Sequence, residues 1–389
     1  MKKSALFAFL LFVSISSLFS QVKSDTTIYM ITCAPGTALY SIYGHSAIRV
    51  TIESANVDVV YNWGVFDFST PHFAWKFAKG RLNYMLDDTS YDRFMQEYML
   101  ENRSVYSQRI NLEPAEKKQL LYLISVNLEE QNKYYRYDFF YDNCSTRIRD
   151  LIEMAVGDKL IYPPEEQKNP SYNQLLDEYQ KQFPWVKFGV DMLMGMTATK
   201  KAKFRERMFL PLEMKENLSS AVVNRDRRMI PLLQSPATLL SFEDQVVKTP
   251  FYLLPDFVFG LILVIIVVIS SLLKSSAIIN YIDIFIFLLF SVLAVMMIFF
   301  NFFTDHIELH TNLNMLWFNP FILPALLALI LRKQWTIWFR LVFYLAVISL
   351  PIVMLTRIVD TSFLPLILIL AVRSSARSDF SWNPFTVTV

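Results

Sequence analysis

The sequence predicts an α+β domain followed by an all-α bundle of about five membrane-spanning helices. Charged residues are frequent up to about Lys248 and nearly vanish between residues 251 and 372, where long apolar runs replace them. The N-terminus has the composition of a secretory signal, and irregularly mixed strand and helix patterns follow it. The formal net charge of the 389 residues is +2, so the composition gives no reason to expect nucleic acid or another polyanion as a partner.

The first 20 residues predict a signal peptide. Lys2 and Lys3 form its positive region, residues 5–13 form its apolar core, and small residues lead to a cleavage site after Ser20. An uncleaved anchor is the alternative. Both interpretations place the chain from about residue 22 onward outside the cytoplasm, so we expect residues 21–250 to form an exported domain.

Hydrophobic patterning and capping residues predict the elements of this exported domain. Strands are expected at residues 27–32, 45–52, 57–63 and 103–110, the second and third as an antiparallel pair. Helices are expected at residues 90–101, 114–130 and 144–155. Asp142 or Asn143 would cap the last helix and Gly157 would end it. The order lacks βαβ regularity, which favours α+β over a doubly wound sheet.

Five apolar stretches predict the membrane half. They lie near residues 254–273, 281–303, 316–331, 335–356 and 361–372. Most approach the roughly 20 residues that a spanning helix needs. The third and fifth are short and contain or adjoin Pro320, Pro324 and Pro365, so their boundaries are the least defined.

Basic residues predict the orientation of the bundle. If the exported domain lies outside, the inside segments contain Lys274, Arg332, Lys333, Arg373 and Arg377. The outside loop of residues 304–315 has no Lys or Arg, and the last outside turn has only one Arg. This is the positive-inside pattern. We therefore expect residues 251–377 to span the membrane and residues 378–389 to form a cytoplasmic tail.

Cys144 is the candidate nucleophile of the exported domain. It occupies the first turn of a predicted helix, where unpaired N–H groups and the helix dipole stabilise a thiolate. The same N–H groups could stabilise an oxyanion on a substrate carbonyl. Cys33, the only other cysteine, ends a predicted strand and has no such advantage.

His45 is the base that we expect to act on Cys144. Only His45 and His72 lie in the exported domain, and His45 follows a glycine that allows close backbone approach and lies on a predicted strand that holds it rigidly. A thiol at a helix start that faces a histidine on a strand is the papain-like arrangement. Since His45 precedes Cys144, the order is that of the circularly permuted version of this fold. For the orienting third group we choose Asn62 on the neighbouring strand, with Tyr61 and His72 as further candidates.

The residue pattern also allows interpretations in which Cys144 and His45 have no catalytic role. In an exported protein, Cys33 and Cys144 can form a disulfide, which would abolish the nucleophile. His45 taken alone can be a hydrogen-bonded core histidine. Spacing along the sequence does not establish that His45 contacts Cys144.

Two more histidines, His306 and His310, lie in the outside loop with Glu308 between them. They would share one face of a helix, but the segment lacks the Glu that directly follows the first His in zinc proteases. We therefore predict no metal site and no cofactor. We expect His306 and His310 to lie just above the membrane and to contact lipid headgroups or substrate.

A set of short motifs runs through both halves of the chain. They are Tyr-Gly-His-Ser-Ala-Ile-Arg at 43–49, Tyr-Asn-Trp-Gly-Val-Phe-Asp-Phe at 61–68, Gly-Arg-Leu-Asn-Tyr at 80–84, Tyr-Asp-Asn-Cys-Ser-Thr-Arg-Ile-Arg-Asp at 141–150, Met-Phe-Leu-Pro at 208–211 and Asn-Leu-Asn-Met-Leu-Trp-Phe-Asn-Pro at 312–320. Together they resemble the Lnb-type lipoprotein N-acyltransferase family of Bacteroidota. The resemblance covers nearly the whole chain after the signal, and the motif around Cys144 is its most specific part.

This resemblance implies a multi-pass enzyme of lipoprotein maturation in the inner membrane, with its N-terminal domain in the periplasm. Cys144 would accept an acyl chain from a phospholipid as a thioester. The free amine of a diacylglyceryl-cysteine at a lipoprotein N-terminus would then take it, with His45 as the base. The wider similarity is to permuted NlpC-like thiol enzymes. We expect Tyr43 and Arg147, which stand in the motifs of His45 and Cys144, to contact substrate.

Two rival functions remain at the level of sequence. A membrane-tethered NlpC-like peptidoglycan hydrolase would use the same Cys144 and His45, although a single anchor would suffice for it. A non-catalytic envelope protein would instead contain a disulfide between Cys33 and Cys144. Labelling of free thiols separates the disulfide-bonded protein from both enzymes.

Overall fold

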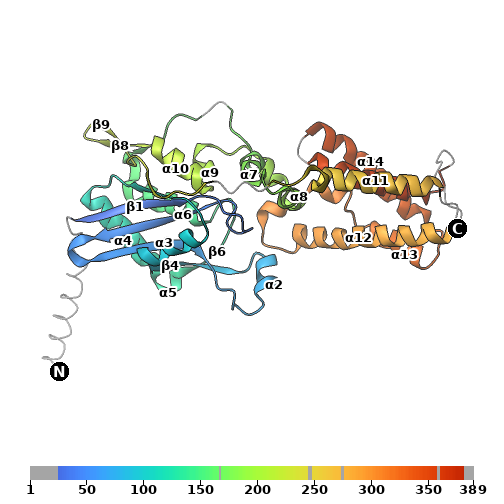
Figure 1. Cartoon of the computed structure of the whole chain (residues 1–389), viewed down its shortest axis with the longest axis horizontal. Coiled ribbons are helices and arrows are strands. Elements are labelled where there is room, and N and C mark those ends of the chain that lie inside the picture. The colour runs from blue at the N-terminus through green and yellow to red at the C-terminus, as the bar shows by residue number, and fades with distance from the viewer. Residues whose placement is uncertain (1–24, 166–167, 244–247, 273–275, 357–359, 381–389) are drawn as a thin grey trace, which may run out of the picture. The chain divides into compact units, whose positions relative to one another are not determined.

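The computed structural model describes residues 25–165, 168–243, 248–272, 276–356 and 360–380 (Figure 1). The signal peptide expected at residues 1–20 lies outside these ranges. The described residues form two compact units. Unit 1 contains those of Met1–Phe73, Leu82–Asn169 and Ala202–Gln245, and unit 2 contains those of Ala74–Arg81, Pro170–Lys201 and Val246–Val389. Two segments that precede residue 250 therefore pack with the helices that follow it.

Unit 1 is built on a seven-stranded antiparallel sheet of order β10-β5-β1-β2-β3-β4-β6 (Figure 1). Its strands are β1 (Thr26–Cys33), β2 (His45–Ile52), β3 (Val57–Val65), β4 (Asn83–Ser90), β5 (Val105–Arg109), β6 (Tyr134–Arg136) and β10 (Ala237–Leu240). A second antiparallel sheet contains β7 (Leu160–Ile161), β8 (Val222–Arg225) and β9 (Arg228–Pro231). The helices of unit 1 are α3 (Tyr91–Leu100), α4 (Pro114–Leu128), α5 (Glu130–Lys133), α6 (Cys144–Val156), α9 (Phe204–Arg207) and α10 (Pro211–Ser220).

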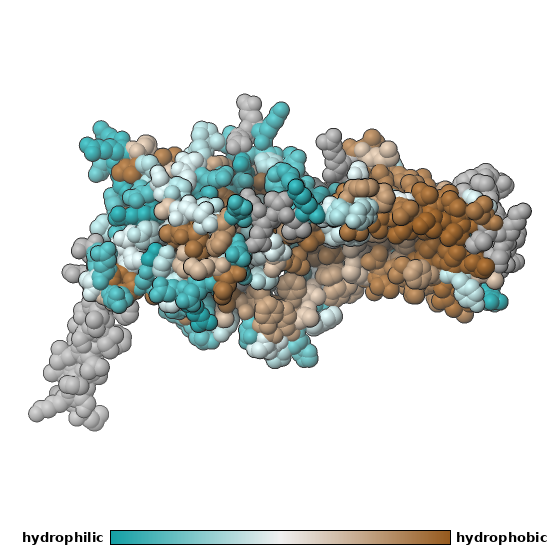
Figure 2. Space-filling view, viewed as in Figure 1, coloured by the Kyte–Doolittle hydropathy of each residue, from teal (hydrophilic) through white to brown (hydrophobic). Residues whose placement is uncertain are grey.

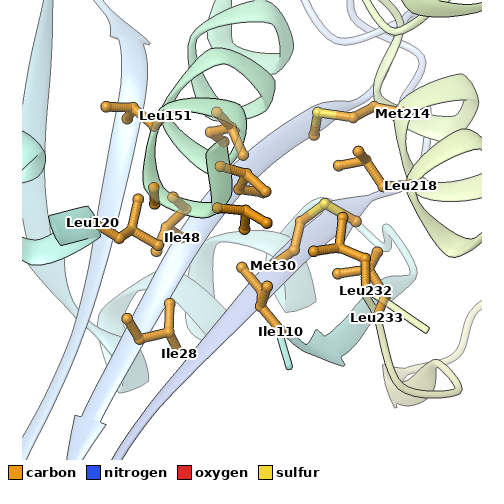
Figure 3. Close-up of a cluster of buried hydrophobic side chains, with 14 of the residues drawn as sticks. Ile28, Met30, Ile48, Ile110, Leu120, Leu151, Met214, Leu218, Leu232 and Leu233 are labelled. Carbon is orange, nitrogen blue, oxygen red and sulfur yellow. The ribbon is translucent and has the colours of Figure 1, made fainter. Parts of the chain in front are cut away.

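Helices cover both faces of the large sheet, because apolar side chains alternate along its strands. Ile28 and Met30 of β1 pack in one core with α4, α6 and α10 (Figure 3). Ile31 and Cys33 of the same strand point to the other face, where they pack in a second core with Phe94 of α3. The result is a three-layer arrangement with α6 in the larger core.

The structure confirms the predicted α+β class and the elements on which the candidate site depends. The expected strand pair is β2 and β3, which are antiparallel. The expected helix at residues 90–101 is α3, with Ser90 as its cap and Phe94 and Tyr98 buried. The helix expected from residue 144 is α6, and Asn143 rather than Asp142 is its cap. The sequence did not predict β4, β6 and β10.

Unit 2 is helical. It contains α7 (Tyr172–Gln180), α8 (Pro184–Leu193), α11 (Pro255–Leu272), α12 (Ser276–Phe302), α13 (Ile322–Ile330), α14 (Thr336–Thr356) and α15 (Leu364–Ala376), together with all of α2 (Phe73–Ala78) except its first residue. Figure 2 shows an almost continuous apolar surface over α11 and α12.

Three helices of the described residues are long and apolar enough to cross a membrane, namely Pro255–Leu272, Ala277–Phe302 and Thr336–Leu355. The expected number of about five is not confirmed. The stretch expected at 316–331 becomes helical only at Ile322, because a short 3-10 helix (Leu313–Leu316) and Pro320 precede it. The nine residues of α13 rise roughly 14 Å, about half of the hydrocarbon thickness. Helix α15 has 13 residues and is also short.

Within unit 2, two asparagines of the 312–320 motif, Asn312 and Asn314, form hydrogen bonds with the C-terminal end of α8. The Asn312 side-chain amide donates to the carbonyl oxygens of Met192 and Leu193 at 2.9 and 2.8 Å. The Asn314 amide donates to the carbonyl of Met192 at 3.0 Å, and its oxygen accepts from the Trp317 indole at 3.1 Å. These bonds satisfy carbonyl groups that the helix end leaves unpaired.

A buried ion-pair cluster joins α11, α12 and α15. The Asp283 carboxylate accepts from Arg373 at 2.5 and 2.9 Å and from Arg377 at 2.6 Å, and Arg373 also donates to the Ser270 hydroxyl at 2.7 Å. Arg373 and Arg377 were expected only as inside flanking charges. The structure instead places both side chains in the protein interior.

Candidate active site

Asn143 fixes the start of α6 and therefore the position of Cys144. Its side-chain oxygen accepts the N–H groups of Ser145 and Thr146, both at 2.9 Å. Its amide donates to the carbonyl oxygens of Phe139 at 2.8 Å and Phe209 at 3.0 Å. Asn143 is buried, so these four bonds satisfy all of its polar atoms in the interior.

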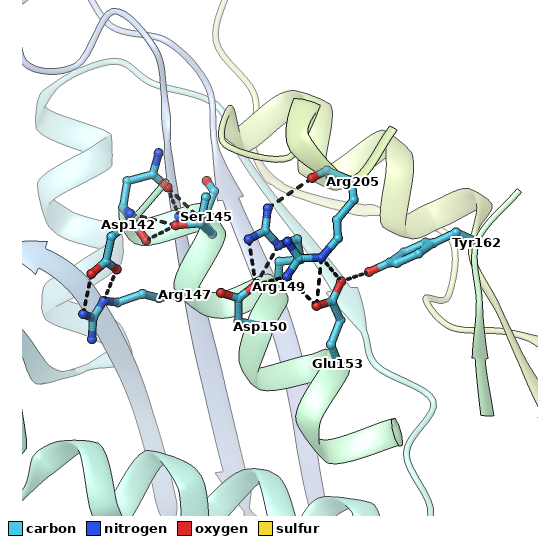
Figure 4. Close-up of polar contacts among 10 residues, drawn as sticks. Asp142, Ser145, Arg147, Arg149, Asp150, Glu153, Tyr162 and Arg205 are labelled. Atoms are coloured by element: carbon cyan, nitrogen blue, oxygen red, sulfur yellow. Dashed lines mark hydrogen bonds and ion pairs between the residues drawn. The ribbon is translucent and has the colours of Figure 1, made fainter. Parts of the chain in front are cut away.

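The far half of α6 is held by a second polar network, drawn in Figure 4. Arg205 pairs with Asp150 at 2.6 Å and with Glu153 at 2.7 Å, and the Tyr162 hydroxyl donates to Glu153 at 2.7 Å. Arg149 donates to the Arg205 carbonyl at 3.1 Å. Both ends of the helix that carries the thiol are thus tied to neighbouring segments.

His45 and Asn62 come from neighbouring strands of the sheet. Asn62 pairs with Ala47, two residues after His45 on β2. The His45 Nε2–H donates to the Asn62 side-chain oxygen across 3.2 Å. Gly44, which precedes His45, has a φ of +83°, a conformation that favours glycine. A Cβ at residue 44 would also lie only 2.8 Å from the Cys33 carbonyl oxygen, so a larger residue would clash with the backbone of β1.

Charge and hydrogen bonding couple the Cys144 thiol to the His45 ring. Burial raises the pKa of Cys144, but attraction to His45, a hydrogen bond with its ring and the Ser46 N–H bring this pKa below the ordinary 9.0. Burial lowers the pKa of His45, whereas Cys144 and Asn62 raise it to a net value above 6.5. Because Asn62 occupies Nε2, Nδ1 is the ring nitrogen left for the sulfur. The two shifts favour a thiolate–imidazolium pair.

Cys33 has the opposite character. It is fully buried, and burial raises its pKa to about 12. Both cysteines are free thiols, so the disulfide between Cys33 and Cys144 that the sequence left open is absent from the structure. Cys144 is the one of the two cysteines with the electrostatic environment of a nucleophile.

The structure places Arg147 and Tyr43 in the surroundings of this pair. Arg147 forms a two-pronged ion pair with Asp142, with N–O distances of 2.5 and 2.8 Å (Figure 4). Its guanidinium carbon lies 3.5 Å from the centre of the Tyr135 ring. The Tyr43 ring contacts Phe139, with the ring centres 4.9 Å apart. Contact of Arg147 and Tyr43 with substrate stays a prediction.

His306 and His310 belong to unit 2, where each bonds to a backbone carbonyl. The His306 Nε2 lies 3.0 Å from the Phe77 oxygen, and the His310 Nε2 lies 3.0 Å from the Thr304 oxygen. Over the described ranges, no group of three His, Cys, Asp or Glu side chains is arranged to hold a metal ion. Contact of these two histidines with substrate stays a prediction too.

The sequence did not indicate that Gly64 and Tyr135 lie near Cys144. A Cβ added to Gly64, whose φ is +88°, would lie 3.8 Å from the Cys144 Cβ and 3.9 Å from the Tyr135 hydroxyl oxygen. The signal available for Tyr135 was the run of aromatic residues just before the Cys144 motif. That run indicates no particular contact until β6 pairs with β4.

Comparison with known families accounts for both halves of the chain. A family model described as the Lnb N-terminal periplasmic domain matches residues 19–175, and one described as the Lnb transmembrane domain matches residues 245–380. No curated protein and no solved structure matches. The chain therefore belongs to the Lnb family, as a membrane protein with a periplasmic N-terminal domain followed by a transmembrane domain.

Proposed function

We propose that this protein moves an acyl chain from a phospholipid to the N-terminal amine of a lipoprotein through a thioester on Cys144. The observation that carries the proposal is the arrangement of buried Cys144 with half-buried His45 and Asn62, in which the pKa of the thiol is lowered and that of the imidazole is raised. A thiolate held beside an imidazolium has both the nucleophile and the acid that acyl transfer requires. Family membership supports a function in the lipoprotein system of the envelope.

The chemistry proceeds in two steps. The Cys144 sulfur bonds to the carbonyl carbon of a phospholipid ester, the ester C–O bond breaks, and the His45 imidazolium gives its proton to the leaving lysophospholipid oxygen. The lipoprotein amine then bonds to the thioester carbonyl carbon, neutral His45 takes a proton from the nitrogen, and the C–S bond breaks to restore the thiolate. Asn62 holds the ring orientation that both proton transfers need.

Residence in the membrane supports lipid substrates over soluble ones. Three described helices are long and apolar enough to span the bilayer, so the enzyme shares a phase with a phospholipid donor and a lipidated acceptor. We propose the inner membrane as that bilayer. A peptidoglycan hydrolase with the same thiol would act on a polar substrate and would need only one anchor.

Intact mass spectrometry of full-length protein incubated with phospholipid vesicles tests the thioester. We expect wild type to gain one fatty-acyl mass that hydroxylamine removes, and Cys144→Ser to gain none that hydroxylamine removes. An unmodified Cys144 in wild type after incubation, with the thiol still open to alkylation, would contradict a phospholipid donor. An adduct on another residue would contradict the assignment of Cys144.

A further inference from the structure

The Tyr135 hydroxyl is a buried polar group that lacks a hydrogen-bond acceptor for its proton among the described residues. The side chain is 8% exposed, so water does not readily supply the missing acceptor. A buried donor without an acceptor lowers the stability of the folded state. A buried group without a partner calls for an explanation, and a role in catalysis is one.

This hydroxyl and the Cys144 side chain both face Gly64. The Tyr135 hydroxyl oxygen and the Cys144 Cβ both lie within 4 Å of the point where a Cβ on Gly64 would stand, and no side chain fills that point. Burial, with a smaller contribution from the nearby Cys144, raises the pKa of Tyr135 well above 10.0. The hydroxyl therefore keeps its proton at neutral pH and remains a donor.

The first turn of α6 supplies fewer donors than the sequence indicates. Of its first three N–H groups, those of Ser145 and Thr146 donate to the Asn143 side chain. The N–H of Cys144 is the one of the three that this cap leaves for an oxyanion. An oxyanion is stabilised best by two preorganised donors, so a second one has to come from outside the helix.

We propose that the Tyr135 hydroxyl is this second oxyanion donor, a role that rests on the acyl transfer proposed above. When the Cys144 sulfur bonds to the ester carbonyl carbon, the C=O electron pair moves onto the oxygen, and the Tyr135 O–H donates to the oxyanion. The pair returns to re-form the carbonyl as the ester C–O bond breaks, and His45 protonates the leaving oxygen. Tyr135 keeps its proton throughout.

Arg147 is a positioning residue for this hydroxyl. Its guanidinium lies over the Tyr135 ring, with its carbon 3.5 Å from the ring centre, and Asp142 accepts two hydrogen bonds from the edge of the guanidinium. The stacked cation restrains the ring without taking the hydroxyl proton. The Asp142 and Arg147 pair thus fixes the ring that carries the donor.

Two reactions of the same thiol separate oxyanion stabilisation from thiolate formation. p-Nitrophenyl butyrate develops an oxyanion on its carbonyl when Cys144 attacks, whereas iodoacetamide reacts at a saturated carbon and develops none. Tyr135→Phe removes one oxygen atom and keeps the ring. In full-length protein in detergent, we expect this variant to lower the burst rate of p-nitrophenolate about 10²–10³-fold and to change the alkylation rate by less than about twofold.

Tyr84→Phe is the matched control, because Tyr84 pairs with Tyr135 across β4 and β6 and its ring contacts Tyr137. We expect it to leave both rates unchanged. Equal losses of the burst rate and the alkylation rate in Tyr135→Phe would assign the residue a structural role and overturn the proposal. An unchanged burst rate in Tyr135→Phe would overturn it as well. So would a wild type that is alkylated normally but shows no burst. A wild type that shows the burst but takes no acyl chain from phospholipid vesicles would contradict the phospholipid donor and leave Tyr135 in place.

Discussion

The pKa values of the two cysteines of this chain shift in opposite directions because of what surrounds each sulfur. Cys144 receives hydrogen bonds and faces a histidine, so its pKa falls below 9.0 in spite of burial. Cys33 lies in an apolar core against Tyr98, and its pKa rises to about 12. The fraction of thiolate at a given pH follows directly from these shifts.

Alkylation by iodoacetamide measures this difference. Because the pKa of Cys144 is lowered, its thiolate persists as the pH falls below 9.0, and we expect its rate to show an inflection below that value. His45→Ala removes the two largest effects that offset burial, so the inflection should move to a higher pH. Peptide mapping should find no label on Cys33 at pH 7–8. The same inflection in both proteins, or label on Cys33, would contradict the pairing.

In the proposed reaction, Asn62 acts through the orientation of the His45 ring. Asn62→Ala removes the acceptor at 3.2 Å and leaves the ring free to turn, which we expect to slow formation of the acyl adduct on Cys144 about 10²-fold. Asn62→Asp keeps an acceptor and should retain most of the rate. Equal rates for Asn62→Ala and wild type in the adduct assay would show that Asn62 has no orienting role.

At the scale of elements, the cap of α6 supports both the fold and the site. Asn143→Ala removes two bonds to helix N–H groups and two more to the carbonyls of Phe139 and Phe209, so we expect a loss above the usual 1 kcal/mol or so for a cap. The alkylation rate of Cys144 should fall as well. Thermal unfolding and alkylation of the same sample measure the two effects.

Ser90→Ala is the matched control for this cap. Ser90 caps α3 through one exposed bond of 3.4 Å, far from α6 in sequence. We expect a smaller fall in Tm and no change in the alkylation of Cys144. If Ser90→Ala and Asn143→Ala lower Tm equally and leave alkylation unchanged, the cap of α6 has no special part in the site.

The ion-pair cluster in unit 2 is also an interaction between elements. Asp283→Asn would leave Arg373 and Arg377 buried without a counter-charge, and breaking a buried pair in this way costs about 3–5 kcal/mol. Ser270→Ala removes one bond to Arg373 and should cost only about 1 kcal/mol. Unfolding of the full-length protein in detergent ranks the two variants. A smaller loss of unfolding free energy for Asp283→Asn than for Ser270→Ala would contradict these ion pairs.

At the scale of the whole molecule, local patterns predicted the parts of the fold whose causes are local. Alternating apolar residues located β1, β2 and β3, and a capping residue before Cys144 located α6. Cys144 and His45 were candidates because the exported domain has only two cysteines and two histidines, and Asn62 was a candidate because it lies on a neighbouring predicted strand. The structure brings these three together.

The rest of the fold and of the candidate site depends on contacts between segments that are distant in sequence, and the periodicity of apolar residues does not predict such contacts. Tyr135 reaches the site through the pairing of β6 with β4, about 50 residues earlier in the chain. Arg373 follows the positive-inside pattern, yet its partner Asp283 lies 90 residues away. The number of spanning helices was also uncertain in sequence, because prolines shorten the helical part of the apolar stretch that contains α13.

The most direct test of the account is a single-turnover chase of the acyl-enzyme. Full-length protein carrying an acyl chain on Cys144 is separated from vesicles and mixed with a diacylglyceryl-cysteine peptide, and both masses are followed with time. We predict that the peptide gains the acyl mass as Cys144 loses it, in a linkage that resists hydroxylamine, and that His45→Ala slows the transfer. Loss of the acyl chain as free fatty acid, at the same rate with or without peptide, would contradict transfer to an amine and identify a hydrolase.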